Sequence, residues 1–146
     1  KPMIDMDMVS VNHEITAQLA RSAVRASTNL PVKYVVLDTK TGRTGRYLAA
    51  FRGRKTVMAV CYQLHAQRIL ALSYGVVPIL RNQELRDKYH FLIDALEFLD
   101  QYSKLADDDL LAIVGGSFGP DGGASYIEFA SVRNIRRRNA EIEAHK

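Results

Sequence analysis

Three short apolar runs, each separated from the next by a segment long enough for a helix, constrain the fold of this chain more than any other feature. The runs cover residues 34–37, 55–61 and 76–80 and are rich in valine. Such runs are too short for buried helices and are typical of strands covered on both faces of a parallel sheet. The segments 44–52 and 63–73 between them carry apolar residues at helical spacing. Strands joined by helices pair in parallel with right-handed crossovers, so the sequence predicts an α/β fold.

The flanking segments complete the predicted architecture. Apolar residues at helical spacing predict one helix over residues 11–27 and a longer amphipathic helix over 87–103. Two further strands are predicted over 110–114 and 125–132. Residues 115–123 between them are too few for a crossover helix, so the last strand should run antiparallel to its neighbour. We therefore expect a three-layer α/β/α sandwich whose mixed sheet has about five strands, most of them parallel.

A polar segment follows the first run and leads into the next predicted helix. Asp38 breaks the run, and the residues after it are Thr39, Lys40, Thr41, Gly42, Arg43 and Thr44. Free backbone N–H groups at a helix start favour a phosphate, while hydroxyls and cations add hydrogen bonds and charge. The spacing matches neither the P-loop nor the GxGxxG pattern. The same residues also suit a polar turn in which a threonine caps the helix, so an anion site and a plain turn both stay open.

A glycine-rich connection between the last two strands is the second candidate binding segment. It contains Gly119, Pro120, Asp121, Gly122 and Gly123. Glycines allow backbone N–H groups to approach an anion closely, and a flexible loop can close over a ligand held at residues 39–44. The alternative is a long hairpin connection without a function. Loops of this length in compact domains are often functional, which favours binding.

The composition is that of an ordinary globular domain. The chain has 146 residues, of which 47% are hydrophobic and 25% charged, and this is enough to bury a core without disulfides. Its one cysteine, Cys61, lies in an apolar run. This favours a buried structural thiol over a nucleophile and agrees with a reducing compartment. The sequence has neither a signal peptide pattern nor an apolar stretch of ~18 residues, so no membrane segment is expected.

The basic excess is concentrated in the last residues. The formal net charge is +4, and residues 133–146 include three consecutive arginines, Arg136, Arg137 and Arg138. These arginines could contact nucleic acid, but no aromatic residue is interleaved with them to stack on a base. A solvated, poorly ordered terminal extension is therefore the favoured interpretation.

The usual catalytic and metal-binding patterns are missing from the sequence. None of the four histidines has a carboxylate or thiol partner at ligand spacing, and these histidines are His13, His65, His90 and His145. Asp107, Asp108 and Asp109 are consecutive, which is more typical of a solvated turn than of a metal cluster. The residues therefore predict a binding domain with neither a catalytic residue nor a metal site.

Three segments of the chain resemble parts of one known domain: VVLDTKTGRTGRYL, TVMAVCYQLHAQRILALSYGVVPIL and DDDLLAIVGGSFGPDGGASYIEFASV. The domain that they resemble is the C-terminal, regulatory domain of pyruvate kinase. They resemble, in order, a strand with its threonine-rich loop, a strand–helix–strand unit, and a strand followed by a glycine-rich loop and the closing strand. The resemblance extends from about residue 11 to residue 132. The chain differs from many members at Ser125 and Tyr126, where they carry Thr-Asn.

The resemblance implies a parent enzyme that transfers phosphate between phosphoenolpyruvate and ADP. That chemistry, with Mg²⁺ and usually K⁺, would belong to a catalytic TIM barrel absent from this chain, so the fragment alone is expected to be inactive and to need no cofactor. The family's C-terminal domain helps to build a tetramer and often binds a phosphorylated effector. By resemblance, the effector phosphate would lie at residues 39–44, and the loop matching Gly119 to Gly123 would close on it.

The resemblance also suggests how the chain is divided and where it works. Residues 1–132 would form the domain, with residues 1–10 as the lead-in from an upstream domain, and residues 133–146 would be a basic C-terminal extension. The expected location is the cytoplasm, and the expected partners are the effector, the parent's barrel and further copies in a homo-oligomer. A stand-alone α/β domain that binds a small anion or acts as a scaffold is the alternative.

Overall fold

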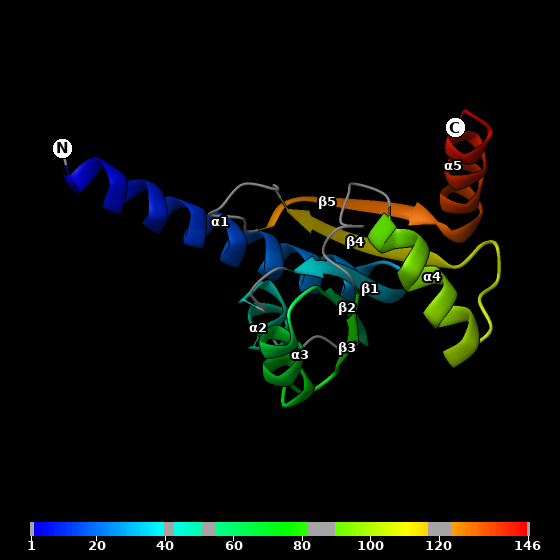
Figure 1. The fold of residues 1–146 in the computed structure, drawn as a ribbon, viewed down its shortest axis with the longest axis horizontal. Helices are drawn as coiled ribbons and strands as arrows, with labels where there is room; N and C mark the ends of the chain where they lie inside the picture. The colour runs from blue at the N-terminus through cyan, green and yellow to red at the C-terminus, as the bar shows by residue number, and fades with distance from the viewer. Residues whose placement is uncertain (1, 40–42, 51–54, 82–89, 117–123, 146) are drawn as a thin grey trace.

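The computed structural model describes residues 2–39, 43–50, 55–81, 90–116 and 124–145, and Figure 1 shows their arrangement. Helices and strands alternate along most of the chain. Their bounds are α1 Pro2–Asn29, β1 Val32–Thr39, α2 Arg43–Ala50, β2 Val57–Cys61, α3 Leu64–Ala71, β3 Val76–Leu80, α4 His90–Tyr102, β4 Leu110–Gly116, β5 Ala124–Ser131 and α5 Val132–Ala144.

The strands form one five-stranded sheet in the order β3-β2-β1-β4-β5. β1 pairs in parallel with β2 on one side and with β4 on the other, and β2 pairs in parallel with β3. β5 runs antiparallel to β4. The predicted mixed sheet, with only its last strand antiparallel, is therefore confirmed.

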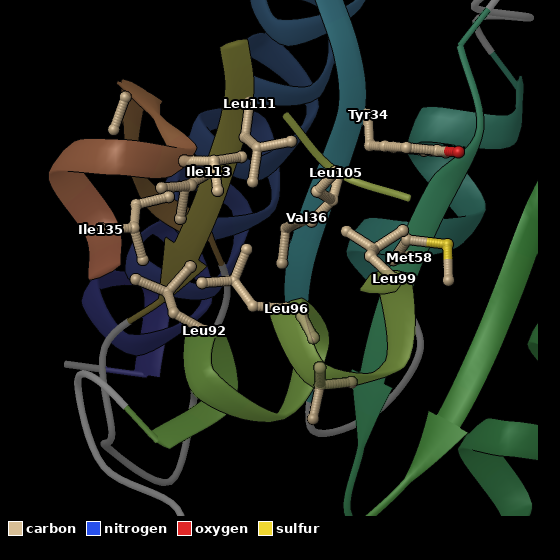
Figure 2. Close-up of a cluster of buried hydrophobic side chains, with 14 of the residues drawn as sticks. Tyr34, Val36, Met58, Leu92, Leu96, Leu99, Leu105, Leu111, Ile113 and Ile135 are labelled. Atoms are coloured by element: carbon tan, nitrogen blue, oxygen red, sulfur yellow. The ribbon is translucent and has the colours of Figure 1, made fainter. Parts of the chain in front are cut away.

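Helices cover both faces of the sheet, as the prediction of three layers requires. Side chains of α1, α2 and α3 pack with Val35 and Leu37 on one face, which we call the α2 face. Side chains of α4 and α5 pack with Tyr34 and Val36 on the other, the α4 face. Figure 2 shows the α4 face, where leucines of α4 point toward Val36 and the neighbouring strands. In β1, β2 and β4, successive residues alternate between two buried cores, so these central strands show no polar side.

The first helix is longer than predicted. It begins at Pro2 rather than near residue 11, and its first turns extend beyond the sheet in Figure 1. Proline is tolerated in the first turn because the N–H that it lacks would have no partner there. The residues up to 10 contain no other helix breaker, so nothing stops the helix before the sheet is reached.

The expectation of a poorly ordered C-terminal extension is wrong for the residues up to Ala144, because they form α5. The Ser131 side chain caps this helix by accepting a hydrogen bond from the Asn134 N–H at 3.2 Å. Val132 and Ile135 are buried in the core of the α4 face. Basic residues dominate this segment, so its few apolar side chains at helical spacing were too weak a signal.

Candidate functional site

The two predicted binding segments begin at neighbouring strand ends. β1 and β4 are adjacent and parallel, with Leu37 paired to Val114, so Thr39 at the end of β1 lies beside the end of β4 at Gly116. The chain leaves β1 into α2 on one face, whereas it reaches β4 from α4 on the other. In α/β sheets such a switch point forms a crevice at the carboxyl edge, where ligands bind.

The loops themselves lie outside the described residues. These are Lys40, Thr41 and Gly42 of the first segment and Gly119, Pro120, Asp121, Gly122 and Gly123 of the second. The structure therefore places the ends of the first segment, Thr39 and Thr44, and the strands on which the second is mounted. It brings the bases of the two predicted segments together.

The start of α2 is held against the end of β1 by close packing. Arg43 begins the helix, and the side chain of Thr44 in its first turn is only 4% exposed. A Cβ added at Gly45 would lie 2.6 Å from Leu70 Cδ2 and 3.3 Å from Leu37 Cδ2. Real Cβ atoms do not come so near, so glycine is what allows α2 to approach α3 and β1. The free N–H groups of α2 therefore begin at the switch point.

Asp38 and Thr39 are buried strand residues, although Asp38 was expected to break the run. β1 continues through both, and their side chains are 5% and 4% exposed. They pair with Val60 and Cys61 of β2, so the ladder uses their backbone groups. By alternation from Val36, Asp38 belongs to the α4 face and Thr39 to the α2 face. A hydroxyl and a carboxyl group thus lie on opposite faces of the sheet at the carboxyl end of β1.

Cys61 is a buried structural thiol, as the sequence predicted. Burial, with a smaller contribution from the negative charge of Asp38, raises the pKa of this thiol to about 11. Its Sγ donates a hydrogen bond to the Ala59 carbonyl at 3.4 Å. The thiol is therefore protonated at neutral pH and is not a nucleophile.

Two small hollows elsewhere in the described chain do not coincide with the predicted site. One of about 350 Å³ lies between α1, α2 and β2 and is lined by residues such as Val24, Lys55 and Tyr74. The other, of about 250 Å³, lies between α4 and α5. Neither is lined by Thr39 or Thr44. The first is close to the lower limit for typical ligand pockets, and the second is below it.

The acidic turn and two of the arginines of the C-terminal segment form structural contacts with each other and with their neighbours. Arg136 pairs with Asp100 of α4 and with Asp107, at 2.9 Å in each case. Arg138 pairs with Glu128 of β5 at 2.5 Å. The pKa of Asp109 is lowered, chiefly by the hydrogen bond that it accepts from the Ala106 N–H, which is 2.8 Å long. The acidic turn therefore anchors α5.

The described residues show neither a metal centre nor a membrane span. No cluster of three or more His, Cys, Asp and Glu side chains in the described ranges is placed to hold a metal ion. No helix in this part of the chain is both long and apolar enough to cross a membrane.

The structure adds residues that the sequence did not single out. Gly45 and Gly115 both stand where a neighbouring side chain leaves no room for a Cβ atom, and the neighbour of Gly115 is the ring of Tyr126. No sequence motif marks them, because the need for glycine appears only when the strand pairing is known.

The strand order and the switch point between β1 and β4 define a doubly wound α/β domain, the class in which ligands bind at the carboxyl edge of the sheet. The family model described as "Pyruvate kinase, alpha/beta domain" matches residues 17–128. The chain therefore belongs to the family of pyruvate kinase α/β domains, and the resemblance identified in the sequence is confirmed.

Curated relatives agree with the family assignment. Pyruvate kinase of Lactobacillus delbrueckii is 26% identical over 121 residues, which cover 82% of this chain and 20% of the relative. Pyruvate kinase of Borreliella burgdorferi is 25% identical over 124 residues, covering 83% and 26%. Pyruvate kinase 2 of Synechocystis is 30% identical over 105 residues, covering 71% and 18%. The chain spans about a fifth to a quarter of the length of these relatives.

Proposed function

We propose that this chain is the regulatory and assembly domain of a pyruvate kinase and that it binds a phosphorylated effector at residues 39–44. The observation that carries the proposal is the switch point between β1 and β4. There, a hydroxyl-rich and cationic segment leading into α2 starts beside the strand that leads into the glycine-rich connection. These are the parts of an anion site, and they come from segments far apart in the sequence.

The residues of the site would act by electrostatics and hydrogen bonding. The N–H groups at the start of α2 favour a negative charge, and the hydroxyls of Thr39, Thr41 and Thr44 can donate to phosphate oxygens. Lys40 and Arg43 would add charge, which makes such hydrogen bonds stronger. A ligand bound here would regulate the enzyme only if it bound one arrangement of the subunits more tightly than another.

The proposal assigns the chemistry of the parent enzyme to another domain. The relatives are named pyruvate kinases, which transfer phosphate between phosphoenolpyruvate and ADP, and their extra length would include the catalytic barrel. Mg²⁺ and K⁺ would serve that barrel, and the whole enzyme would be a cytoplasmic tetramer. The purified chain should then catalyse no phosphoryl transfer from phosphoenolpyruvate. Turnover by this chain would contradict the assignment of catalysis to another domain.

A thermal-shift screen tests the effector site directly. The chain is heated alone and with ribose 5-phosphate, glucose 6-phosphate, AMP, fructose 1,6-bisphosphate or inorganic phosphate. A ligand at about 100 times its Kd should stabilise the fold by ~2.7 kcal/mol, which raises the Tm by several degrees in a domain of this size. If no compound raised the Tm, the effector site would be rejected for this chain, and assembly would be the role that is left.

A double variant locates the site. Arg43→Ala with Thr44→Ala should weaken binding by roughly 2–4 kcal/mol, because both residues would make charge-assisted hydrogen bonds. Arg46→Ala is the matched control, since Arg46 lies one turn further along α2 and is exposed. Equal affinity in the double variant and the wild type would remove residues 43 and 44 from the site.

Two other functions compete with this proposal. A stand-alone scaffold of the same fold would show neither ligand binding nor association with a catalytic barrel. A nucleic-acid function would use the arginines of α5, but Arg136 and Arg138 already pair with carboxylates. Salt-dependent binding of DNA or RNA that is lost when Arg136 to Arg138 are replaced would support it.

A further inference from the structure

Three residues at the carboxyl edge lie side by side on the α4 face. Leu37 of β1 pairs with Val114 of β4, so the next residues, Asp38 and Gly115, are neighbours. Gly115 in turn pairs with Tyr126 of β5. Tyr126 packs against the core of the α4 face. Strand alternation puts Asp38 on the same face. A carboxyl group, a glycine and a phenol thus follow one another across three strands.

The missing side chain of Gly115 determines where the phenol lies. A Cβ at this position would be 2.2 Å from both Cζ and the hydroxyl oxygen of Tyr126. The far end of the ring therefore lies over Gly115, and Tyr126 extends from β5 across β4 in the direction of β1. Neighbouring strands are about 4.8 Å apart, so the hydroxyl lies about one strand spacing from β1, the strand that carries Asp38. The phenol oxygen is placed at the switch point rather than at the outer edge of the sheet.

The two sides of the crevice differ in chemistry. On the α2 side lie the largely buried Thr39 and Thr44 and the start of α2, which suit a phosphate. On the α4 side, a carboxylate can only accept hydrogen bonds, and a phenol can donate or accept one. Such groups suit the hydroxyls of a sugar, whereas a carboxylate repels a second phosphate.

We propose that Asp38 and Tyr126 are the specificity-determining residues of this crevice, and that they select a phosphate monoester bearing free hydroxyls over a bisphosphate. The inference rests on the proposed effector site and names the class of its ligand. Asp38 accepts a hydrogen bond from a ligand hydroxyl, and the Tyr126 hydroxyl shares in the same contact. The phosphate lies on the α2 side.

A comparison of dissociation constants tests the selectivity of the site between monoesters and the bisphosphate. Dissociation constants are measured by calorimetry for ribose 5-phosphate, glucose 6-phosphate, AMP, fructose 1,6-bisphosphate and inorganic phosphate. The wild-type chain should bind at least one monoester about tenfold more tightly than the bisphosphate, because a second phosphate would meet the carboxylate. Asp38→Asn should raise the affinity for the bisphosphate about tenfold and leave inorganic phosphate unchanged.

A second variant tests the phenol. Tyr126→Phe keeps the ring over Gly115 and removes the hydroxyl, so monoester affinity should fall about fivefold, as expected for one hydrogen bond. Two controls remove equivalent groups elsewhere. Glu128→Gln removes a carboxylate from β5 that pairs with Arg138, and Tyr34→Phe removes a hydroxyl that bonds Ser103 at the other end of the sheet. Neither control should change the ratio of monoester to bisphosphate affinity.

The outcomes separate this inference from the proposed function. If the bisphosphate binds as tightly as every monoester, the inference is overturned and the effector site stands. The same holds if Asp38→Asn lowers the Tm but leaves the affinity ratio unchanged, because Asp38 is then only structural. If the wild type binds no phosphate compound, both the inference and the effector site are overturned.

Discussion

Gly115→Ala is the substitution whose effect follows most directly from the geometry of the carboxyl edge. The new Cβ would lie 2.2 Å from Cζ and the hydroxyl oxygen of Tyr126 and 2.5 Å from Cε1, whereas ordinary contacts are 3.4 Å or longer. Either the ring or the strand must move. Overpacking of this kind typically costs 1–3 kcal/mol, and the ring also loses its contacts with the core of the α4 face. We expect the free energy of unfolding to fall by about 2–3 kcal/mol.

A double-mutant cycle shows whether the ring is the cause. With Tyr126→Ala in place, Gly115→Ala meets no obstacle and should be neutral or stabilising by up to about 1 kcal/mol, because alanine restricts the unfolded chain. The coupling energy between the two positions should therefore be about 2–3 kcal/mol. Urea unfolding followed by circular dichroism gives all four free energies.

Gly75→Ala is the control for this cycle. Gly75 has φ +74°, and among the described residues other than its chain neighbours no atom would lie within 4 Å of an added Cβ. Alanine there therefore costs only backbone strain, about 1–2 kcal/mol, whatever residue is present at position 126. If Gly115→Ala costs the same with and without the Tyr126 ring, the placement of the phenol at the switch point is wrong.

Three further predictions concern the rest of the fold. Ile135→Ala removes a buried side chain from α5 and should cost about 2–4 kcal/mol in urea unfolding, whereas a loss below about 0.5 kcal/mol would mean that α5 is not docked. Arg136→Ala breaks two exposed ion pairs and should cost at most about 1 kcal/mol, with a smaller loss in 1 M salt. Arg137→Ala leaves both of these ion pairs intact and should be neutral. Cys61 should react with iodoacetamide at pH 8 only when urea unfolds the chain, and rapid alkylation of the folded chain would contradict the raised pKa. The free energy of unfolding should fall as the pH rises from 9 toward 11, because the thiol of the unfolded chain loses its proton at a lower pH than the thiol of the folded chain.

The parts of the fold that the sequence could predict are those with a single dominant signal. The short apolar runs around Val35, Val60 and Val76 predict strands that are buried on both faces. The connection after β4 is too short for a crossover helix, so it predicts an antiparallel partner strand. The structure confirms both. Asp38 was misjudged because a polar residue at the end of an apolar run suggests a break, whereas the ladder with β2 uses its backbone regardless of its side chain.

The C-terminal helix and the crevice needed information that periodicity does not contain. α5 is stabilised by the Ser131 cap and by the burial of Ile135, but arginines dominate the composition of the segment and suggested a solvated extension. The pairing of Gly115 with Tyr126 depends on register, which becomes visible only when β4 and β5 are aligned. The sequence could identify residues 39–44 and 119–123 as candidate binding segments. Residue types alone could not predict that these two segments begin at neighbouring strand ends.

The position of the crevice follows from the handedness of the connections. The chain moves from β1 to β2 to β3 in one direction, and right-handed crossovers then place α2 and α3 on one face. It must return past β2 and β1 to add β4 on the other side of the sheet, so the same handedness places α4 on the opposite face. The strand between these two movements is β1, where the connections change from one face of the sheet to the other. A hydroxyl-rich segment after β1 and a glycine-rich segment after β4 are therefore brought to one edge by the chirality of the backbone. For this reason, Asp38, Gly115 and Tyr126 lie together at this edge, although none of them belongs to a recognisable motif.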